Sequence, residues 1–139
     1  MEKQILLRNE IFINGKIVPN FMYILNEFID SKGKIYSEFS LSQEDYNFLQ
    51  EIQKIETCAL ISNTMRKRPI SKKEYHQISI SLDKKDLESL ILIIKKHEIN
   101  AIVNCNSLRL FFNDNDGDFL LVDTRIINYQ KLKDLIMKL

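Results

Sequence analysis

The sequence predicts an α+β fold: a mainly antiparallel sheet of about six strands built from hairpins, with three to four helices packed on it. Three patterns support this prediction: short runs of alternating apolar and polar residues, clusters of turn-forming residues between neighbouring runs, and apolar residues at helical spacing in separate segments. Strands joined by tight turns pair antiparallel, which favours hairpins over βαβ units. A chain of 139 residues is expected to form one globular domain over residues 1–139.

The first predicted elements rest on local turn and helix signals. Asn14-Gly15 predicts a hairpin, because a type I′ turn needs positive φ at both central positions. Pro19 suits the first turn of a helix, where its missing N–H costs nothing, and apolar residues recur from Phe21 at i, i+3, i+4 and i+7. In chain order the predicted elements are a hairpin over 10–18, a helix from 19 that ends at 31–33, a strand over 34–39, a helix from 42 to about 56, strands over 57–63 and 75–82, a helix over 83–97, strands over 101–104, 108–112 and 119–123, and a helix from 128.

Polar residues mark the starts of the later helices. Ser42 is predicted to cap the second helix, with acids in its first turn, where they complement the positive end of the helix dipole. Asp83 is predicted to cap the third helix, with Asp86 at the capping-box position. Asn128 is predicted to cap the last one.

The helix over 83–97 is apolar over most of its circumference. A helix of this kind is either central or covered by a second surface. A homodimer that buries the excess apolar area of this helix is therefore one expectation, and a third layer of the same chain is the other.

The segment from Leu108 to Thr124 is the most informative stretch, because two apolar runs flank a cluster of Asn, Asp and Gly. This pattern predicts a hairpin with an acidic tip. Its three acids are candidates for binding a cationic partner protein, and acids nearer the N-terminus could extend the patch. The candidate partner-binding residues are Asp114, Asp116, Asp118, Glu38, Glu44 and Asp45.

The same tip also resembles an EF-hand loop in part of its spacing. If Gly117 takes the glycine position, Phe112 falls on the first ligand position, where it cannot bind a cation, and the flanks are strands rather than helices. A turn whose Asn and Asp side chains satisfy its own backbone is the favoured interpretation. We therefore predict no metal site and no cofactor.

Charge is unevenly placed along a chain whose net charge is only +1. Residues 1–64 carry a net −3, residues 65–99 a net +4, and residues 100–139 balance. A basic loop between two predicted strands could contact phosphates, with Tyr75 near by to stack on a base. A solvated loop whose lysines discourage edge-to-edge pairing is the favoured interpretation, because no other basic segment extends the patch into a groove. The candidate nucleic-acid-binding residues of this alternative are Arg66, Lys67, Arg68, Lys72 and Lys73.

Cys58 and Cys105 are the only cysteines, and neither has a CxxC partner. Both lie in apolar runs, which predicts free thiols in the core. An enzyme remains an alternative if one of these thiols meets His76 in space. No basic and apolar leader is visible at the N-terminus, so the cytoplasm is the expected location.

The leading hypothesis is a small cytoplasmic protein that is not an enzyme and acts by binding another protein. A bacterial immunity protein that neutralises a toxin by occluding it fits best, with a cationic toxin domain as partner. A secretion-type chaperone and a nucleic-acid-binding or regulatory module are the alternatives. No membrane association is expected.

Overall fold

Seven strands form one sheet in the computed structural model, which describes residues 1–8, 10–12, 17–29 and 33–139. Every pairing between these strands is antiparallel. The predicted α+β class is confirmed, with one strand more than the predicted six. The strands are β1 (Glu2–Leu6), β2 (Lys34–Leu41), β3 (Ala59–Lys67), β4 (Glu74–Asp83), β5 (Ala101–Cys105), β6 (Leu108–Asp114) and β7 (Gly117–Asp123), in the spatial order β1-β7-β6-β5-β2-β4-β3.

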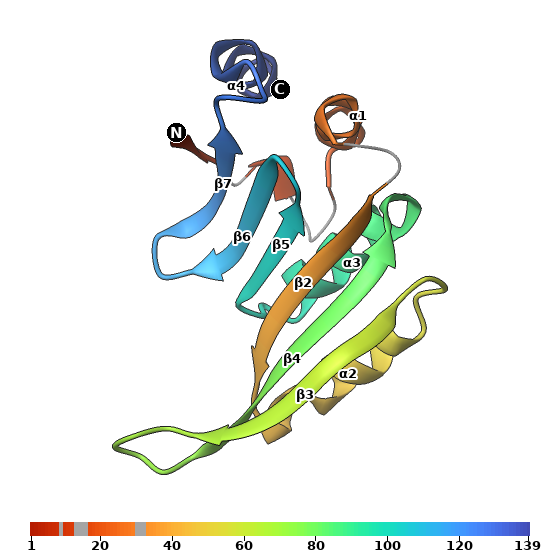
Figure 1. Ribbon diagram of the computed structural model, residues 1–139, viewed down its shortest axis with the longest axis vertical. Helices are drawn as coiled ribbons and strands as arrows, with labels where there is room; N and C mark the ends of the chain where they lie inside the picture. Colours follow the sequence, from red (N-terminus) through yellow and green to blue (C-terminus); the bar gives the residue numbers. More distant parts are fainter. Residues whose placement is uncertain (9, 13–16, 30–32) are drawn as a thin grey trace.

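Four helices accompany the sheet. Figure 1 shows α2 and α3 behind the sheet. Helices α1 and α4 lie near the upper end of the sheet in this view, where both ends of the chain are also found. Short 3-10 turns, Gln43–Asp45 and Lys84–Asp86, lead directly into α2 and α3. The helices are α1 (Pro19–Phe28), α2 (Tyr46–Gln53), α3 (Leu87–Lys96) and α4 (Tyr129–Met137).

Alternation along the strands gives the sheet one buried face and one open face. In β2 every second residue from Ile35 to Leu41 is buried, and the residues between them are exposed. Successive side chains of a strand point to opposite faces, so one face of β2 lies against the helices and the other faces solvent. Phe39 of the buried face meets Phe48 of α2 edge to face, with ring centroids 5.0 Å apart. This pair holds α2 against the sheet.

The N-terminal prediction was partly wrong. Residues 10–12 form a 3-10 turn instead of a strand, and the predicted Asn14-Gly15 turn lies outside the described residues. The strand at this end is β1, which pairs with β7 and extends the sheet. Ile5 is the one buried residue of β1, so this edge strand lacks the alternation that reveals a strand in sequence.

Two of the three predicted caps are confirmed. The backbone N–H of Ser42 donates to the Asp45 carboxylate at 2.9 Å within a capping box. Asn128 Oδ1 accepts from the backbone N–H of Lys131 at 3.0 Å.

Asp83 is the N-cap residue of the 3-10 turn that leads into α3, as predicted, but its side chain makes no capping hydrogen bond, and the predicted capping box with Asp86 was wrong. Asp83 accepts from Lys34 Nζ at 2.6 Å, and Asp86 accepts from the hydroxyl of Thr57 at 2.5 Å. Both carboxylates bind groups of neighbouring segments, which local spacing cannot reveal. Asp86 thereby anchors the chain just before β3.

Candidate protein-binding surface

The edge strand β3 leaves an unusual amount of apolar surface in solvent. All nine of its residues are exposed. Leu60, Ile61 and Met65 have exposed fractions of 54%, 55% and 55%. An edge strand also presents unpaired backbone N–H and C=O groups, so β3 offers both hydrogen-bonding groups and apolar side chains to a partner.

The register with β4 places part of this apolar surface on the helix-covered side of the sheet. Leu60 is opposite Ile80, and Met65 is opposite His76. Directly opposite residues of an antiparallel pair share a face, and Ile80 is fully buried against the core. Leu60 and Met65 therefore point toward the side on which α2 lies.

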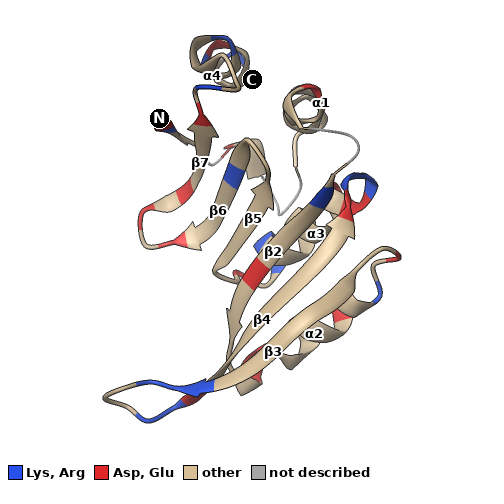
Figure 2. Ribbon diagram, in the orientation of Figure 1, with Lys and Arg blue, Asp and Glu red and all other residues tan. Residues whose placement is uncertain are grey.

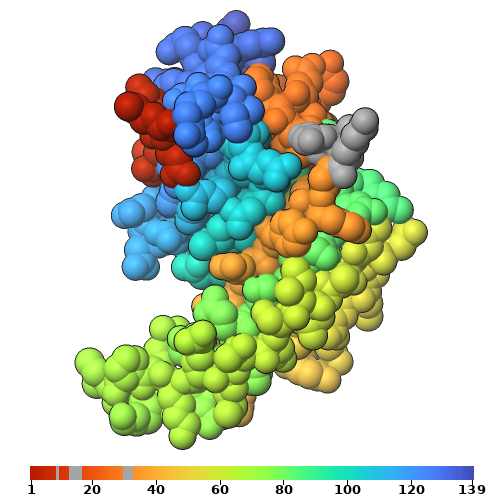
Figure 3. Space-filling view, in the orientation of Figure 1, coloured from red at the N-terminus to blue at the C-terminus, as the bar shows by residue number. Residues whose placement is uncertain are grey.

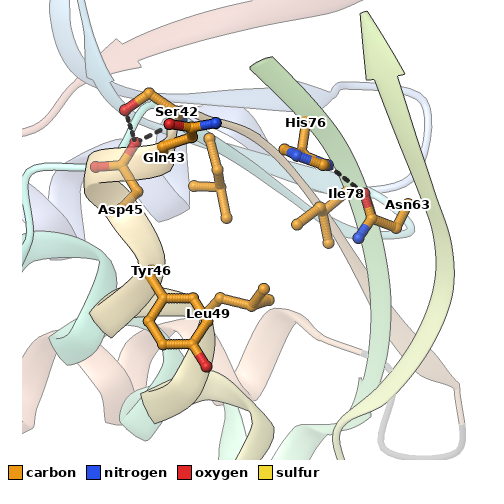
Figure 4. Close-up of a pocket in the computed structure, with 9 residues that line it drawn as sticks. Ser42, Gln43, Asp45, Tyr46, Leu49, Asn63, His76 and Ile78 are labelled. Atoms are coloured by element: carbon orange, nitrogen blue, oxygen red, sulfur yellow. Dashed lines mark hydrogen bonds between the residues drawn. The ribbon is translucent and has the colours of Figure 1, made fainter. Parts of the chain in front are cut away.

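A groove separates α2 from this part of the sheet. Figure 4 shows Tyr46 and Leu49 of α2 facing His76, Ile78 and Asn63 across an open space. The cavity measures about 240 Å³ and is lined mainly by apolar atoms. Its residues are Leu41, Ser42, Gln43, Asp45, Tyr46, Leu49, Asn63, His76 and Ile78.

One hydrogen bond orders the polar wall of the groove. His76 Nδ1 donates to Asn63 Oδ1 at 2.9 Å, linking β4 to β3. On the opposite wall, the Tyr46 side chain is 62% exposed. Sequence analysis missed this groove, because Tyr46 and Asn63 lie in different elements and carry no shared motif. The only available signal was the Ala59-Leu60-Ile61 run, whose lack of alternation is atypical of a half-buried strand.

Beyond the groove, the β3–β4 hairpin projects from the body of the protein (Figure 3). Its end carries the predicted basic residues, with Arg66 and Lys67 at the end of β3 and Arg68, Lys72 and Lys73 in the turn that leads to β4 (Figure 2). The Arg68 guanidinium lies over the Tyr75 ring at 4.6 Å, and Ile70 at the tip is 96% exposed. The predicted basic loop is thus a projecting arm, defined here as residues 66–75.

The three acids of the predicted acidic tip lie in different environments. Asp118 turns inward, where its carboxylate accepts from Lys95 Nζ and from the backbone N–H of Asn113 at 2.8 Å. Asp114 accepts from the backbone N–H of Asp116 at 3.2 Å, as expected of an Asx turn. Asp116 is the exposed acid of the three.

The remaining acids of the predicted patch lie on other elements. Glu38 is on the open face of β2, while Glu44 is exposed on the 3-10 turn after β2. Asp45 caps that same turn. The six predicted acids therefore lie in three separate parts of the fold, namely β2, the 3-10 turn after it and the β6–β7 hairpin, and their role in binding stays a prediction.

The proposed cysteine–histidine pair does not form. His76 is opposite Leu41 of β2, whereas Asn104, the neighbour of Cys105, is opposite Tyr36. Cys105 is one residue further and therefore level with Ile35, six residues along β2 from Leu41, or roughly 20 Å at the usual rise of a strand. Cys58 precedes β3, at the end of that strand remote from His76.

Both thiols are free, as predicted. Burial raises the pKa of Cys105 to about 12. Burial, together with the nearby Asp86 carboxylate, also raises the pKa of Cys58. Because the thiolate is the reactive form, neither cysteine is poised as a nucleophile.

The apolar helix α3 is well covered by its own chain. Leu87, Leu90, Ile91 and Ile94 are fully buried, and its two remaining apolar residues, Leu92 and Ile93, are partly buried against the core. The predicted dimer through this helix stays a prediction, but α3 offers it less apolar area than its sequence suggests.

Within the described part of the chain, no helix has both the length and the apolar character needed to cross a membrane. The described residues also bring together no group of three or more His, Cys, Asp or Glu side chains able to hold a metal ion. Comparison with known proteins gives no match for this chain among protein-family models, curated proteins or solved structures. The surfaces of the molecule are therefore the guide to its function.

Proposed function

We propose that this chain binds another protein along the edge of β3 and in the groove between β3 and α2. The observation that carries the proposal is the exposure of Leu60, Ile61 and Met65 on β3, the strand at one edge of the sheet. Large apolar side chains exposed along one sheet edge, beside a groove lined mainly by apolar atoms, are typical of interaction sites in soluble proteins. Burying each of these half-exposed side chains would contribute about 1 kcal/mol to binding.

The geometry favours a partner segment in an extended conformation. Such a segment would add a strand to β3, drawing affinity from backbone hydrogen bonds and specificity from alternate side chains. The groove volume of about 240 Å³ lies below the usual range of small-molecule pockets. It suits one apolar side chain of the partner, held between Tyr46 and the His76–Asn63 pair.

Inhibition by occlusion is the form of binding that we propose, as performed by a bacterial immunity protein on its toxin. The contact surface lies largely on regular elements, β3, β4 and α2, which supports this proposal, since little ordering entropy would be lost on binding. A secretion-type chaperone, which also holds another protein, is the second candidate. We also propose a cytoplasmic location; the two free thiols are compatible with a reducing compartment, where disulfides are rare.

The test is capture of the partner from the native cell by immobilised protein, compared between matched variants. Ile61→Thr/Met65→Thr removes apolar area from the binding edge and keeps a strand-forming residue. Leu6→Thr/Ile126→Thr makes a similar change at apolar residues that are 61% and 70% exposed elsewhere.

We expect one protein in stoichiometric amount on the wild type and on the Leu6/Ile126 variant, and its loss from the Ile61/Met65 variant. Circular dichroism and thermal unfolding establish that both variants are folded. A partner retained by the Ile61/Met65 variant would exclude this surface, and the absence of any stoichiometric protein would contradict the function itself. Substituting Asn at Asp114 and Asp116 in a third variant tests the acidic tip in the same assay.

A further inference from the structure

The projecting arm has two faces with different charge. Arg66 is opposite Tyr75, and Lys67 is opposite Glu74. The pairing continues one step outward, because the backbone N–H of Arg68 donates to the carbonyl of Lys73 at 2.9 Å. Opposite residues share a face and successive residues alternate between faces. One face therefore carries Arg66, Arg68, Lys73 and Tyr75, while the other carries Lys67 with its compensating Glu74.

The cationic face of the arm continues into the open face of the sheet. The next pairs on that face are Thr64 with Gln77 and Ser62 with Ser79. These side chains supply hydroxyl and amide groups, which, like Arg and Lys, commonly contact phosphate oxygens. The first acid beside these residues is Glu38 of the neighbouring strand β2, which lies opposite Ser79. We define the phosphate strip as residues Ser62, Thr64, Arg66, Arg68, Lys73, Tyr75, Gln77 and Ser79.

Charge along the chain is concentrated on this arm. Residues 66–75 contain five cations and one acid, a net +4, so the rest of the chain carries −3 of the total +1. The acidic remainder keeps polyanions away from other surfaces, and opposed potentials guide them to the arm. Stacking of Arg68 on Tyr75 at 4.6 Å holds one guanidinium in place before any ligand arrives.

We propose that the phosphate strip binds the backbone of duplex DNA, with the arm entering the major groove. A two-stranded β-ribbon fits this groove, and the β3 side of the phosphate strip, from Ser62 to Arg68, spans about 20 Å, the length of roughly six base pairs. The binding is independent of base sequence, since its contacts are to phosphates. The strip lies on the face of the hairpin opposite the groove proposed for a protein, so each surface can be disabled without the other.

The experiment measures fluorescence anisotropy of a labelled 20-bp duplex with the full chain between 50 and 200 mM salt. Three phosphate contacts, from Arg66, Arg68 and Lys73, predict a slope of log K against log salt of about −2.7, which weakens binding roughly 40-fold over this range. The triple variant Arg66→Gln/Arg68→Gln/Lys73→Gln should abolish the salt dependence. Thermal unfolding of each variant controls for folding.

Two single substitutions at adjacent positions give the sharpest comparison. Arg66→Gln, on the strip, should reduce the slope by about 1. Lys67→Gln removes the same charge from the opposite face and should change the slope far less. Glu38→Gln should strengthen binding, because it removes the nearest acid from the edge of the strip.

Three results would overturn the proposal. No binding at 50 mM salt would exclude it, and equal effects of Arg66→Gln and Lys67→Gln would exclude the strip as the site. Heparin or single-stranded DNA that binds as tightly as the duplex would exclude duplex DNA as the ligand. The Ile61→Thr/Met65→Thr variant should bind DNA normally, which separates this result from the outcome for the protein partner.

Discussion

Replacing Asp118 by Asn should destabilise the protein, although Asp118 belongs to a hairpin tip that is expected to face solvent. Its carboxylate accepts from Lys95 Nζ and from the backbone N–H of Asn113. The Lys95 and Asp118 side chains are only 18% and 11% exposed. The pair therefore joins the end of α3 to the β6–β7 turn in a largely water-excluded environment.

The loss can be bounded from these contacts. Removing one partner of a fully buried ion pair costs about 3–5 kcal/mol. After the substitution, Lys95 Nζ retains its hydrogen bond to Asn113 Oδ1 at 3.3 Å and its cation–π contact with the Phe12 ring at 5.0 Å. The side-chain amide that replaces the Asp118 carboxylate can still accept one hydrogen bond. We therefore expect a loss of about 2 kcal/mol in the free energy of unfolding, or about 6 °C in Tm for a chain of this size.

Urea denaturation followed by circular dichroism measures this loss. The matched control is Asp116→Asn, an exposed acid two residues away, which should change the free energy of unfolding by less than about 0.5 kcal/mol. A similar change in both variants, or a loss below about 0.5 kcal/mol in the Asp118 variant, would refute the inward structural role of Asp118.

Three further predictions concern other parts of the molecule. The hydrogen bond from Lys96 Nζ at 2.9 Å, and then the His97 imidazole 3.2 Å from the carboxylate, lower the pKa of Glu51 below its ordinary 4.5. The stabilisation is complete above that value and is lost as pH falls through the lowered pKa. Glu51→Gln should therefore be destabilising near pH 7 and approach the wild type in acid, as thermal melts across pH would show. In native protein at pH 8 a thiol reagent should label half-buried Cys58 faster than buried Cys105, and equal rates would contradict the burial. Phe48→Ala should cost about 3–5 kcal/mol in urea denaturation, because it empties a fully buried site against the sheet.

The interior elements could be predicted because their burial is written into the sequence. In β4, small polar residues alternate with Ile78, Ile80 and Leu82, and the structure buries those three residues. The edges could not be predicted in the same way. β1 buries Ile5 alone, and β3 extends four residues beyond its predicted end into the basic segment. An edge strand takes its conformation from its neighbour, so its own pattern carries little signal.

The candidate surfaces also differ in how far the sequence revealed them. The arm was visible as a run of cations, because like charges adjacent in sequence stay adjacent on a hairpin. The groove was not visible, since Tyr46 on α2 and Asn63 on β3 meet through the packing of α2 on the sheet. The inward turn of Asp118 also escaped prediction, because Lys95 lies 23 residues away in sequence.

The exposed edge of the β3–β4 hairpin makes the fold less stable than it would be if that edge were covered. Pairing β3 with another strand or covering it with a helix would bury Ile61 and Met65, which solvent now reaches. The edge is nevertheless protected against indiscriminate pairing: a register shift between Leu60 and Ser62 interrupts it, and Arg66 with Lys67 ends it in charge. The register shift lies beside Leu60 and Ile61, and the two cations follow directly after Met65, so each exposed apolar group of β3 has a feature next to it that opposes regular strand pairing. The protein partner that we propose would give this arrangement a role, because the edge would then have to resist copies of the chain and accept one particular segment.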